Sequence, residues 1–307
     1  MESGKEERIK AVLKGAGCCA VGIAQAGPVD AADAAIYDRW LASGHEAGMA
    51  YMHNHRELRM DPRKVLEGCR SVISMAFSYE TEAKRTPDLP SISAYAMLPD
   101  YHVWIKRRIR ESGVSRILGE ESRDWRICVD SAPVRERYWA HRAGLGIIGE
   151  NGMLIVPDAG CKVLLAEILT NLELRADTPM KGNCGQCGSC RRACPAGALH
   201  PGGNIDCNHC LSYLTIEHKG EWEDARHKSA METAAGRATL FGCDRCVNIC
   251  PHNETTIVSA EPPAECMATL TAADITAGKS LPKDSCLRRA GRKGLLRNAT
   301  NTDGGLV

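Results

Sequence analysis

The residues best suited to chemistry in this chain are cysteines, and most of them gather in one stretch. Nine of the sixteen lie within positions 184–253. The first group has the spacing C-x2-C-x2-C-x3-C-P and consists of Cys184, Cys187, Cys190 and Cys194. In bacterial iron–sulfur proteins, three thiolates of such a run hold one [4Fe-4S] cluster and the fourth ligates a neighbouring cluster. The spacing therefore predicts one-electron transfer.

A second, shorter motif repeats the ending C-x2-C-x3-C-P with Cys243, Cys246 and Cys250. Cys210 lies upstream as its displaced first ligand, although Cys207 in the same Cys-Asn-His-Cys segment is an alternative. Because each motif gives its last cysteine to the other cluster, two sets of four follow. Cluster one is assigned Cys184, Cys187, Cys190 and Cys250, and cluster two is assigned Cys194, Cys210, Cys243 and Cys246.

Zinc and disulfide bonds are the alternatives for these cysteines. Zinc sites commonly use two C-x2-C pairs, whereas the x3-C-P ending, present twice, is typical of ferredoxins. Disulfides need an oxidising compartment. The chain opens with the charged residues 1–8 and has no apolar segment of a secretory signal there, so we expect free thiols.

A carboxylate at the end of a predicted strand is the second feature suited to chemistry. The pattern predicts a strand over 126–129 and a helix through Arg137 to Arg142, with Asp130 between them. Asp130 could cap that helix. A carboxylate at a strand end is equally where an α/β fold presents a catalytic acid.

Hydrophobic periodicity predicts the elements that carry these residues. We expect helices over 6–15 and 31–43 and a helix from Tyr101 capped by Asp100. Strands are expected over 17–24, 71–77, 153–156 and 162–170, the last two joined by a Pro-Asp-Ala-Gly turn. Alternating helices and strands before the cysteine stretch indicate an α/β (α+β) fold.

Composition describes a globular chain with uneven charge. It has 307 residues, 44% of them apolar, and a net charge of +1, which leaves room for two domains. No apolar run reaches membrane-spanning length. Positions 278–298 hold seven Lys or Arg against one Asp, and 106–110 form a second basic group. Such groups are usually solvated faces, and contact with nucleic acid is the alternative.

Several motifs, in a fixed order, resemble epoxyqueuosine reductases. The similarity runs from R-M-D-P-R at 59–63 to R-R-A-G-R-K-G-L-L-R-N at 288–298. Between them stand D-S-A-P-V-R-E-R (130–137), A-G-L-G-I-I-G-E-N (143–151), A-E-I-L-T (166–170), C-L-S-Y-L-T-I-E (210–217), G-C-D-R-C (242–246) and C-P-H-N (250–253). The chain resembles a short form of the family, without its C-terminal helical-repeat extension.

The resemblance implies a cobalamin-dependent enzyme that reduces epoxyqueuosine to queuosine at the wobble position of tRNA. It implies a cobalamin-binding catalytic domain at 1–175, a ferredoxin-like two-[4Fe-4S] domain at 176–258 and a basic segment at 259–307 that contacts tRNA. Asp130 matches the family's proton donor, and Arg137 is placed to steer the substrate. The implied cobalamin contacts are Arg59, Ser93, Asp130 and Asp244. Base-off cob(II)alamin is expected, because Asp100-Tyr-His102 lacks the Gly of a D-x-H-x-x-G element.

The same resemblance implies a cytoplasmic monomer that contacts no membrane. Its expected partners are tRNA carrying epoxyqueuosine in the anticodon loop and a low-potential electron donor. Two other classes of protein remain as alternatives. A reductive dehalogenase would share the corrinoid and the paired clusters, but the chain shows no twin-Arg export signal. A plain electron carrier would leave Asp130 and the long N-terminal domain without a purpose.

Overall fold

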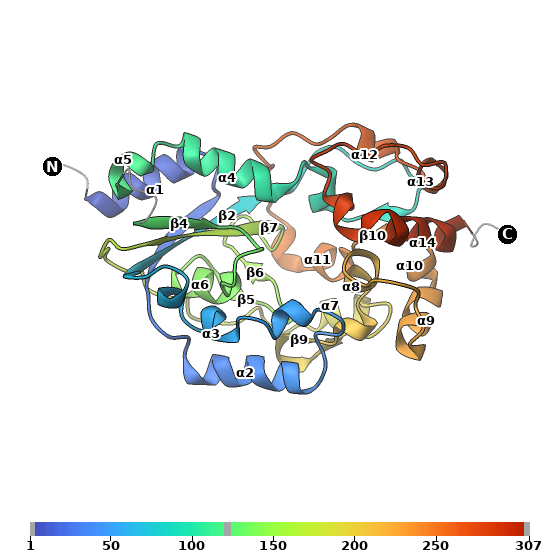
Figure 1. The fold of residues 1–307 in the computed structure, drawn as a ribbon, viewed down its shortest axis with the longest axis horizontal. Coiled ribbons are helices and arrows are strands. Elements are labelled where there is room, and N and C mark those ends of the chain that lie inside the picture. Colours follow the sequence, from blue (N-terminus) through green and yellow to red (C-terminus); the bar gives the residue numbers. More distant parts are fainter. Residues whose placement is uncertain (1–3, 120–123, 304–307) are drawn as a thin grey trace.

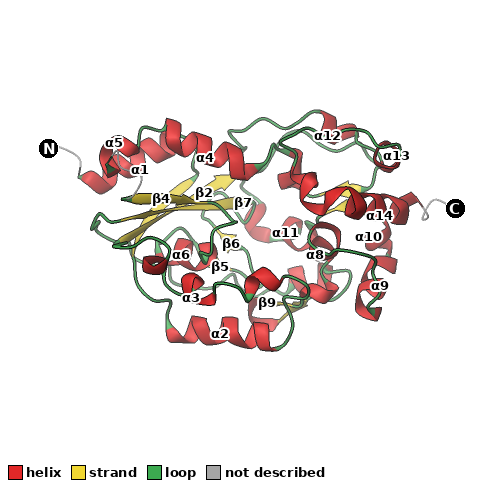
Figure 2. Ribbon diagram, viewed as in Figure 1, coloured by secondary structure: helices red, strands yellow, loops and turns green. Residues whose placement is uncertain are grey.

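A four-stranded antiparallel sheet forms one half of the molecule, and a mainly helical half holds the cysteine motifs (Figures 1 and 2). The structure is a computed structural model that describes residues 4–119 and 124–303. In spatial order the strands are β1 (Ala20–Gln25), β2 (Ser71–Ser78), β7 (Val163–Thr170) and β4 (Trp125–Cys128). Each strand is antiparallel to its neighbours.

Helices cover both faces of this sheet (Figure 1). Because side chains alternate along a strand, Ile73 and Ile168 face one layer while Val72 and Leu169 face the other. The first layer consists of α1 (Lys5–Gly15), α4 (Tyr101–Glu111) and α5 (Ser115–Leu118). The second consists of α2 (Ala31–Ala42), α3 (Arg56–Arg59) and α6 (Glu136–Arg142). Covered on both sides, β2 is buried along its whole length.

The sequence-based elements agree with these bounds to within a few residues, and Asp100 caps α4 as expected, accepting from the His102 backbone N–H. The two strands expected at 153–156 and 162–170 both form, but they belong to different sheets. β6 (Leu154–Ile155) pairs with β5 (Ile147–Ile148) in a separate sheet, while β7 pairs with β2 and β4. A tight bridge between Val156 and Gly160 turns the chain away from β6 before β7 begins.

The second half is built from short elements around the cysteines. Its helices are α7 (Ser189–Ala193), α8 (Leu211–Ile216), α9 (Ala225–Glu232), α10 (Ala234–Arg237), α11 (Arg245–Asn248), α12 (Cys266–Thr269), α13 (Ala272–Thr276) and α14 (Gly291–Asp303). Strand β8 (Leu199–His200) pairs with β9 (Asn204–Ile205). The chain also crosses between the halves, because β3 (Ser91–Ile92) pairs in parallel with β10 (Thr239–Phe241). Within the described ranges, no helix has both the length and the apolar character needed to span a membrane.

The C-terminal basic residues have different environments. Arg297 is buried and donates to the carbonyls of Leu214 and Gly220, so it serves the fold. Arg289 pairs with Glu217 at 2.7 Å. The remaining basic side chains of positions 278–298 are exposed; they are Lys279, which pairs with Asp274, and Lys283, Arg288, Arg292 and Lys293. This exposed group fits the expectation of a solvated face.

Candidate functional site

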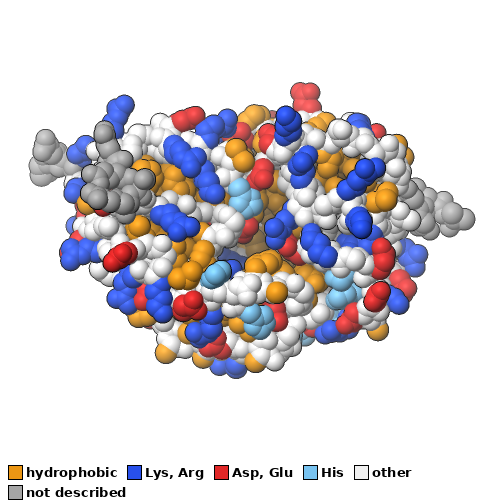
Figure 3. All heavy atoms as spheres, in the orientation of Figure 1, with side chains coloured by type: hydrophobic (Ala, Val, Ile, Leu, Met, Phe, Trp, Pro, Cys, Tyr) orange, Lys and Arg blue, Asp and Glu red, His pale blue; other side chains and the backbone are white. Residues whose placement is uncertain are grey.

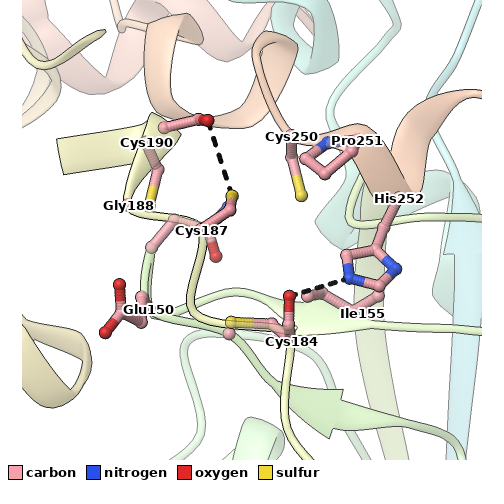
Figure 4. Close-up of a pocket in the computed structure, with 12 residues that line it drawn as sticks. Glu150, Ile155, Cys184, Cys187, Gly188, Cys190, Cys250, Pro251 and His252 are labelled. Carbon is pink, nitrogen blue, oxygen red and sulfur yellow. Dashed lines mark hydrogen bonds between the residues drawn. The ribbon is translucent and has the colours of Figure 1, made fainter. Parts of the chain in front are cut away.

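The cysteines assigned to cluster one line a single pocket. Three come from the loop before α7 and its first turn, and the fourth follows α11; they are Cys184, Cys187, Cys190 and Cys250. Figure 4 shows their side chains around one space, with Glu150 and His252 at its edge. His252 Nε2 lies 3.2 Å from the carbonyl oxygen of Cys184, which ties the two segments together. The empty space among these residues, which is open to solvent, is about 310 Å³.

The cysteines assigned to cluster two line a second pocket of about 410 Å³. They are Cys194, Cys210, Cys243 and Cys246. Cys207, the alternative to Cys210, is not among the residues that line it. Its backbone N–H donates to the carbonyl of His45, so Cys207 lies where the second half meets the loop after α2. The geometry favours Cys210 over Cys207 as the fourth thiol of this set.

The two motifs exchange their last cysteines across a packed helix pair. α7 and α11 lie against each other. Cys194 ends α7 and lines the second pocket, whereas Cys250 follows α11 and lines the first. Each short helix therefore turns its chain from one pocket to the other. This is the arrangement of ligands that two-cluster ferredoxins use.

The spread of these thiols fits a cluster better than a single ion. Among the described residues, no three His, Cys, Asp or Glu side chains converge closely enough to hold one metal ion. A tetrahedral zinc ion draws its sulfurs to about 2.3 Å from one centre. An iron–sulfur cube holds its four thiolates at separate corners and so needs a wider cage. Two four-thiol pockets of this kind fit [4Fe-4S] clusters.

Asp130 follows β4 in a left-handed conformation with a φ of 52° and points toward α4. Its Oδ2 lies 3.1 Å from Nε2 of His102, and its backbone N–H donates to Glu136. Arg135 is the N-cap of α6, and no side chain caps that helix. The helix-cap alternative for Asp130 is therefore wrong. Asn and Asp tolerate this backbone region best among residues with a Cβ.

His102 lies between two carboxylates. Nδ1 is 2.8 Å from Asp100, and Nε2 is 3.1 Å from Asp130. A neutral imidazole can donate from only one ring nitrogen, so two carboxylate partners favour the imidazolium. Burial opposes that charge, but the two carboxylates outweigh it and raise the pKa of His102. Burial raises the pKa of Asp130, and the His102 cation lowers it. The lowering is the larger effect, so the pKa of Asp130 lies below its ordinary value.

The residues implied to contact cobalamin fall into two places. Ser93 Oγ donates to Asp244 Oδ1 at 2.6 Å, and the backbone N–H of Ala94 donates to Oδ2 at 2.6 Å. Burial raises the pKa of Asp244. Arg59 lies on α3, where Nη2 donates to the carbonyl of Tyr51 at 3.3 Å. Its Nε is buried and has no hydrogen-bond partner in the part of the chain that is described.

Arg137 does not contact Asp130. Its Nη1 donates to the carbonyl of Gly152, on the side of α6 that faces the second half. On the face drawn in Figure 3 the surface is hollowed between the two halves, with hydrophobic side chains inside the hollow and His and charged side chains around it. The charge of Arg289, from the C-terminal part, also acts on Asp130. The surroundings of Asp130 are thus drawn from both halves of the chain.

Sequence reasoning missed two groups that contact Asp130 and one buried carboxyl group on β7. His102 was considered only as a cobalt ligand, although it is the direct partner of the carboxylate. Glu136 accepts from the Asp130 backbone, and Glu167 is fully buried on β7. A signal existed for Glu167, since a charge inside the apolar run Leu164–Thr170 needs an explanation.

Two parts of the chain match known families. Residues 59–131 match the family described as epoxyqueuosine reductase QueG, DUF1730. Residues 183–253 match the 4Fe-4S double cluster binding domain, so the cysteine stretch is a domain of this iron–sulfur type.

Curated relatives and solved structures agree with these matches. The epoxyqueuosine reductase of Leadbetterella byssophila is 39% identical over 218 residues, which cover 70% of this chain and 69% of the relative. That of Cellulophaga algicola is 34% identical over 271 residues, covering 85% and 86%. The structure of epoxyqueuosine reductase from Streptococcus thermophilus superposes with a TM-score of 0.83 at 23% identity, covering 98% of this chain and 81% of that one. Another, crystallised with an epoxyqueuosine-modified tRNA stem loop, has a TM-score of 0.78 at 24% identity, covering 96% and 80%. The fold is shared.

Proposed function

The chain belongs to the epoxyqueuosine reductase family of oxidoreductases, and from this premise we propose that it reduces epoxyqueuosine to queuosine at the wobble position of tRNA. The observation that carries the proposal is the 34% identity over 271 residues, because that alignment spans both the sheet half and the cysteine half. The tRNA stem loop bound to a protein of the same fold supports the substrate class. The basic segment at 259–307 would contribute to holding the RNA.

Two [4Fe-4S] clusters would be held by the two sets of four cysteines, with Cys210 rather than Cys207 in the second set. Their contribution is one-electron transfer at low potential. We propose domain boundaries at 175 and 258, which would put this relay after the sheet half, although β3 reaches across to pair with β10. A low-potential donor outside this chain would load the clusters.

Cobalamin is the group that the family resemblance adds, and the residues present suit it. The buried Nε of Arg59 has no protein partner in the described chain and is a donor free for a ligand rich in amide and phosphate acceptors. The buried Ser93 and the half-buried Asp244 form a polar pair at the meeting of the halves. We assign these residues and Asp130 to cobalamin contact. When bound, cobalamin would supply reducing equivalents at the epoxide carbon.

Asp130 is the acid of the proposal. An epoxide oxygen becomes a good leaving group only when it is protonated as the carbon–oxygen bond breaks. Against the effect of burial, the neighbouring carboxylates raise the pKa of His102, which favours an imidazolium paired with the Asp130 carboxylate. Asp130 can pass that proton onward because it is the more exposed partner, at 56% against 31% for His102. Arg137 would orient the substrate from the neighbouring turn of α6.

The test is reconstitution followed by a defined reaction. The protein is purified anaerobically, assayed for iron and acid-labile sulfide, and mixed with cobalamin, a low-potential chemical reductant as electron source and tRNA that carries epoxyqueuosine. We expect both cluster absorbance and queuosine in the digested tRNA, and neither the cobalamin-free protein nor tRNA lacking the epoxide should give product. A protein that holds both clusters and cobalamin but never forms queuosine would contradict the proposed function.

A further inference from the structure

Side chains of opposite charge line the two cysteine pockets. Glu150 belongs to the lining of the cluster-one pocket, and Arg245 belongs to the lining of the cluster-two pocket. Among the described residues, the two linings contain no other Asp, Glu, Lys or Arg. Each lining also contains one histidine, His252 in the first pocket and His209 in the second. The charge that distinguishes the two pockets therefore comes from Glu150 and Arg245.

The Glu150 carboxylate is held beside the cluster-one pocket by an ion pair. Its Oε2 lies 3.4 Å from Nε of Arg191, the residue that directly follows Cys190 on α7. Figure 4 shows the carboxylate at the edge of the space that the four thiols surround. Oε2 is buried and accepts no hydrogen bond from the described residues, so solvent screens its charge little. Arg191 does not line the pocket, so Glu150 is the nearer charge.

Arg245 begins α11, between two thiols of the second set, Cys243 and Cys246. The preceding residue, Asp244, accepts hydrogen bonds from Ser93 Oγ and from the backbone N–H of Ala94. These contacts hold the start of α11, and with it Arg245, at the cluster-two pocket. Arg245 is exposed, so solvent screens its charge more than that of Glu150.

Charges in a cluster pocket change the reduction potential of the cluster, because reduction adds one negative charge to it. A nearby carboxylate disfavours the reduced form and lowers the potential. A nearby guanidinium stabilises the reduced form and raises the potential. The expected effects are therefore a lower potential at the pocket lined by Glu150 and a higher potential at the pocket lined by Arg245.

The surroundings of the two pockets give this difference a direction. Cys187 of the first set is exposed, whereas all four cysteines of the second set are partly buried. Asp244, which is assigned to cobalamin contact above, stands in the chain between Cys243 and Cys246 of the second set. An external electron donor would therefore reach cluster one more easily, and cluster two is the one beside the assigned cobalamin contact.

We propose that Glu150 and Arg245 set the potential of cluster one below that of cluster two, so that electrons pass downhill toward the cobalamin contact. In each step one electron leaves reduced cluster one and enters oxidised cluster two, while no bond changes and no proton moves. The low-potential donor of the proposed function then reduces cluster one again. The inference rests on the proposed function, because it requires both clusters.

A redox titration followed by electron paramagnetic resonance tests the inference on the cluster-loaded protein, without cobalamin or tRNA. The wild-type protein should show two separate midpoint potentials. Cys194→Ala removes a thiol of the second set and should leave only the lower one. Glu150→Gln should raise the lower potential alone. Arg245→Gln should lower the higher potential alone, by a smaller amount because Arg245 is exposed.

Further variants separate an effect of charge from a change of structure. Glu150→Asp and Arg245→Lys keep the charges and should keep both potentials. Arg191→Gln removes the counter-charge of Glu150, so it should shift the lower potential down, opposite to Glu150→Gln. The matched controls are Glu173→Gln and Arg70→Gln, which change the two members of an exposed pair outside both pocket linings. Both controls should keep the wild-type potentials.

Unchanged potentials in both Glu150→Gln and Arg245→Gln would overturn the inference, and so would a Glu150→Gln shift in the higher potential. If Glu150→Gln fails to hold cluster one, Arg191→Gln decides, and an unchanged lower potential in that variant overturns the inference. A wild-type protein that takes up no iron and sulfide would refute the clusters of the proposed function. The expected potentials in a protein that forms no queuosine would refute the proposed reaction and leave the inference standing.

Discussion

Nε2 of His102 lies 3.1 Å from Oδ2 of Asp130, although the two residues come from different elements, α4 and the loop after β4. The contact makes each group stabilise the charged form of the other. The pKa of His102 is raised and that of Asp130 is lowered, despite the burial that acts against both charges. The two groups thus titrate together, and the directions of their pKa shifts favour the pair of carboxylate and imidazolium.

The first prediction concerns stability against pH in His102→Gln. A raised folded pKa contributes stability that is fully present below the unfolded value, near pH 6.5, and is lost as the pH rises through the folded value. The wild-type protein should therefore lose a small part of its stability above pH 6.5, and the variant should not. Because both side chains are partly exposed, we expect about 1 kcal/mol or less.

Thermal melts between pH 5 and 9 would measure this difference. His200→Gln is a suitable control, because His200 is exposed and stacks on His45 with no carboxylate partner among its recorded contacts in the described chain. It should melt like the wild-type protein at every pH. A variant at position 102 that shows the full wild-type slope would mean that the pair does not titrate as described.

The cysteine sets were predictable because their ligands are close in sequence. Seven of the eight fall within two short motifs, and a C-P ending that turns the chain away from one pocket directs it to the next. Cys210 was harder, since Cys207 has the same local signals and only the fold shows which one lines the second pocket. The spacing of residues within a motif therefore predicts contacts only over one turn or one helix.

The surroundings of Asp130 could not be predicted in this way. His102 reaches Asp130 because α4 packs on the sheet through Trp104 and Ile105. The spacing of residues within α4 does not predict where the helix packs. The pairing of β3 with β10 joins segments far apart in the chain through only a few residues. Contacts of this kind depend on how layers pack, which periodicity in one segment does not record.

The second prediction concerns cluster content. Cys194→Ala should lose the cluster that Cys243 and Cys246 help to hold, because the last cysteine of the first motif lines the second pocket. Iron and sulfide should fall from about eight to about four of each per chain. Cys207→Ala is the matched control and should keep both clusters. Loss of iron in Cys207→Ala but not in Cys210→Ala would reverse the choice between these two.

The third prediction concerns the exposed basic residues near the C-terminus. Changing Arg288, Arg292 and Lys293 together to Ala should weaken tRNA binding and flatten its salt dependence. Each phosphate contact that is lost lowers the slope of log K against log salt by roughly 0.7 to 0.9, so a drop of about two is expected. Arg297 is not changed, because its buried side chain donates to backbone carbonyls and removing it would destabilise the fold.

Binding titrations over a range of salt would measure that slope. The control replaces Lys5, Arg8 and Lys14, which are exposed on α1 at the opposite end of the molecule (Figure 1). This variant removes the same charge and should bind like the wild-type protein. If both triple variants change the slope equally, the effect is one of net charge, and the segment near α14 is only a solvated face.

The last prediction concerns Asp130→Asn, which keeps the size of the side chain and its ability to accept a hydrogen bond but cannot carry the acidic proton. Because Asp130 caps no helix, the variant should fold and hold both clusters, and because Asn keeps an acceptor oxygen for the assigned cobalamin contact, it should still bind cobalamin. Asn also tolerates the positive φ at this position, so no backbone strain is added. Queuosine formation should fall by roughly 10²-fold or more, the scale expected for a lost general acid. Asp158→Asn is a matched control, since Asp158 also has a positive φ but lies in the turn between β6 and β7. Queuosine should be measured in digested tRNA for both variants, and near-normal turnover of Asp130→Asn would leave His102 or another group as the acid.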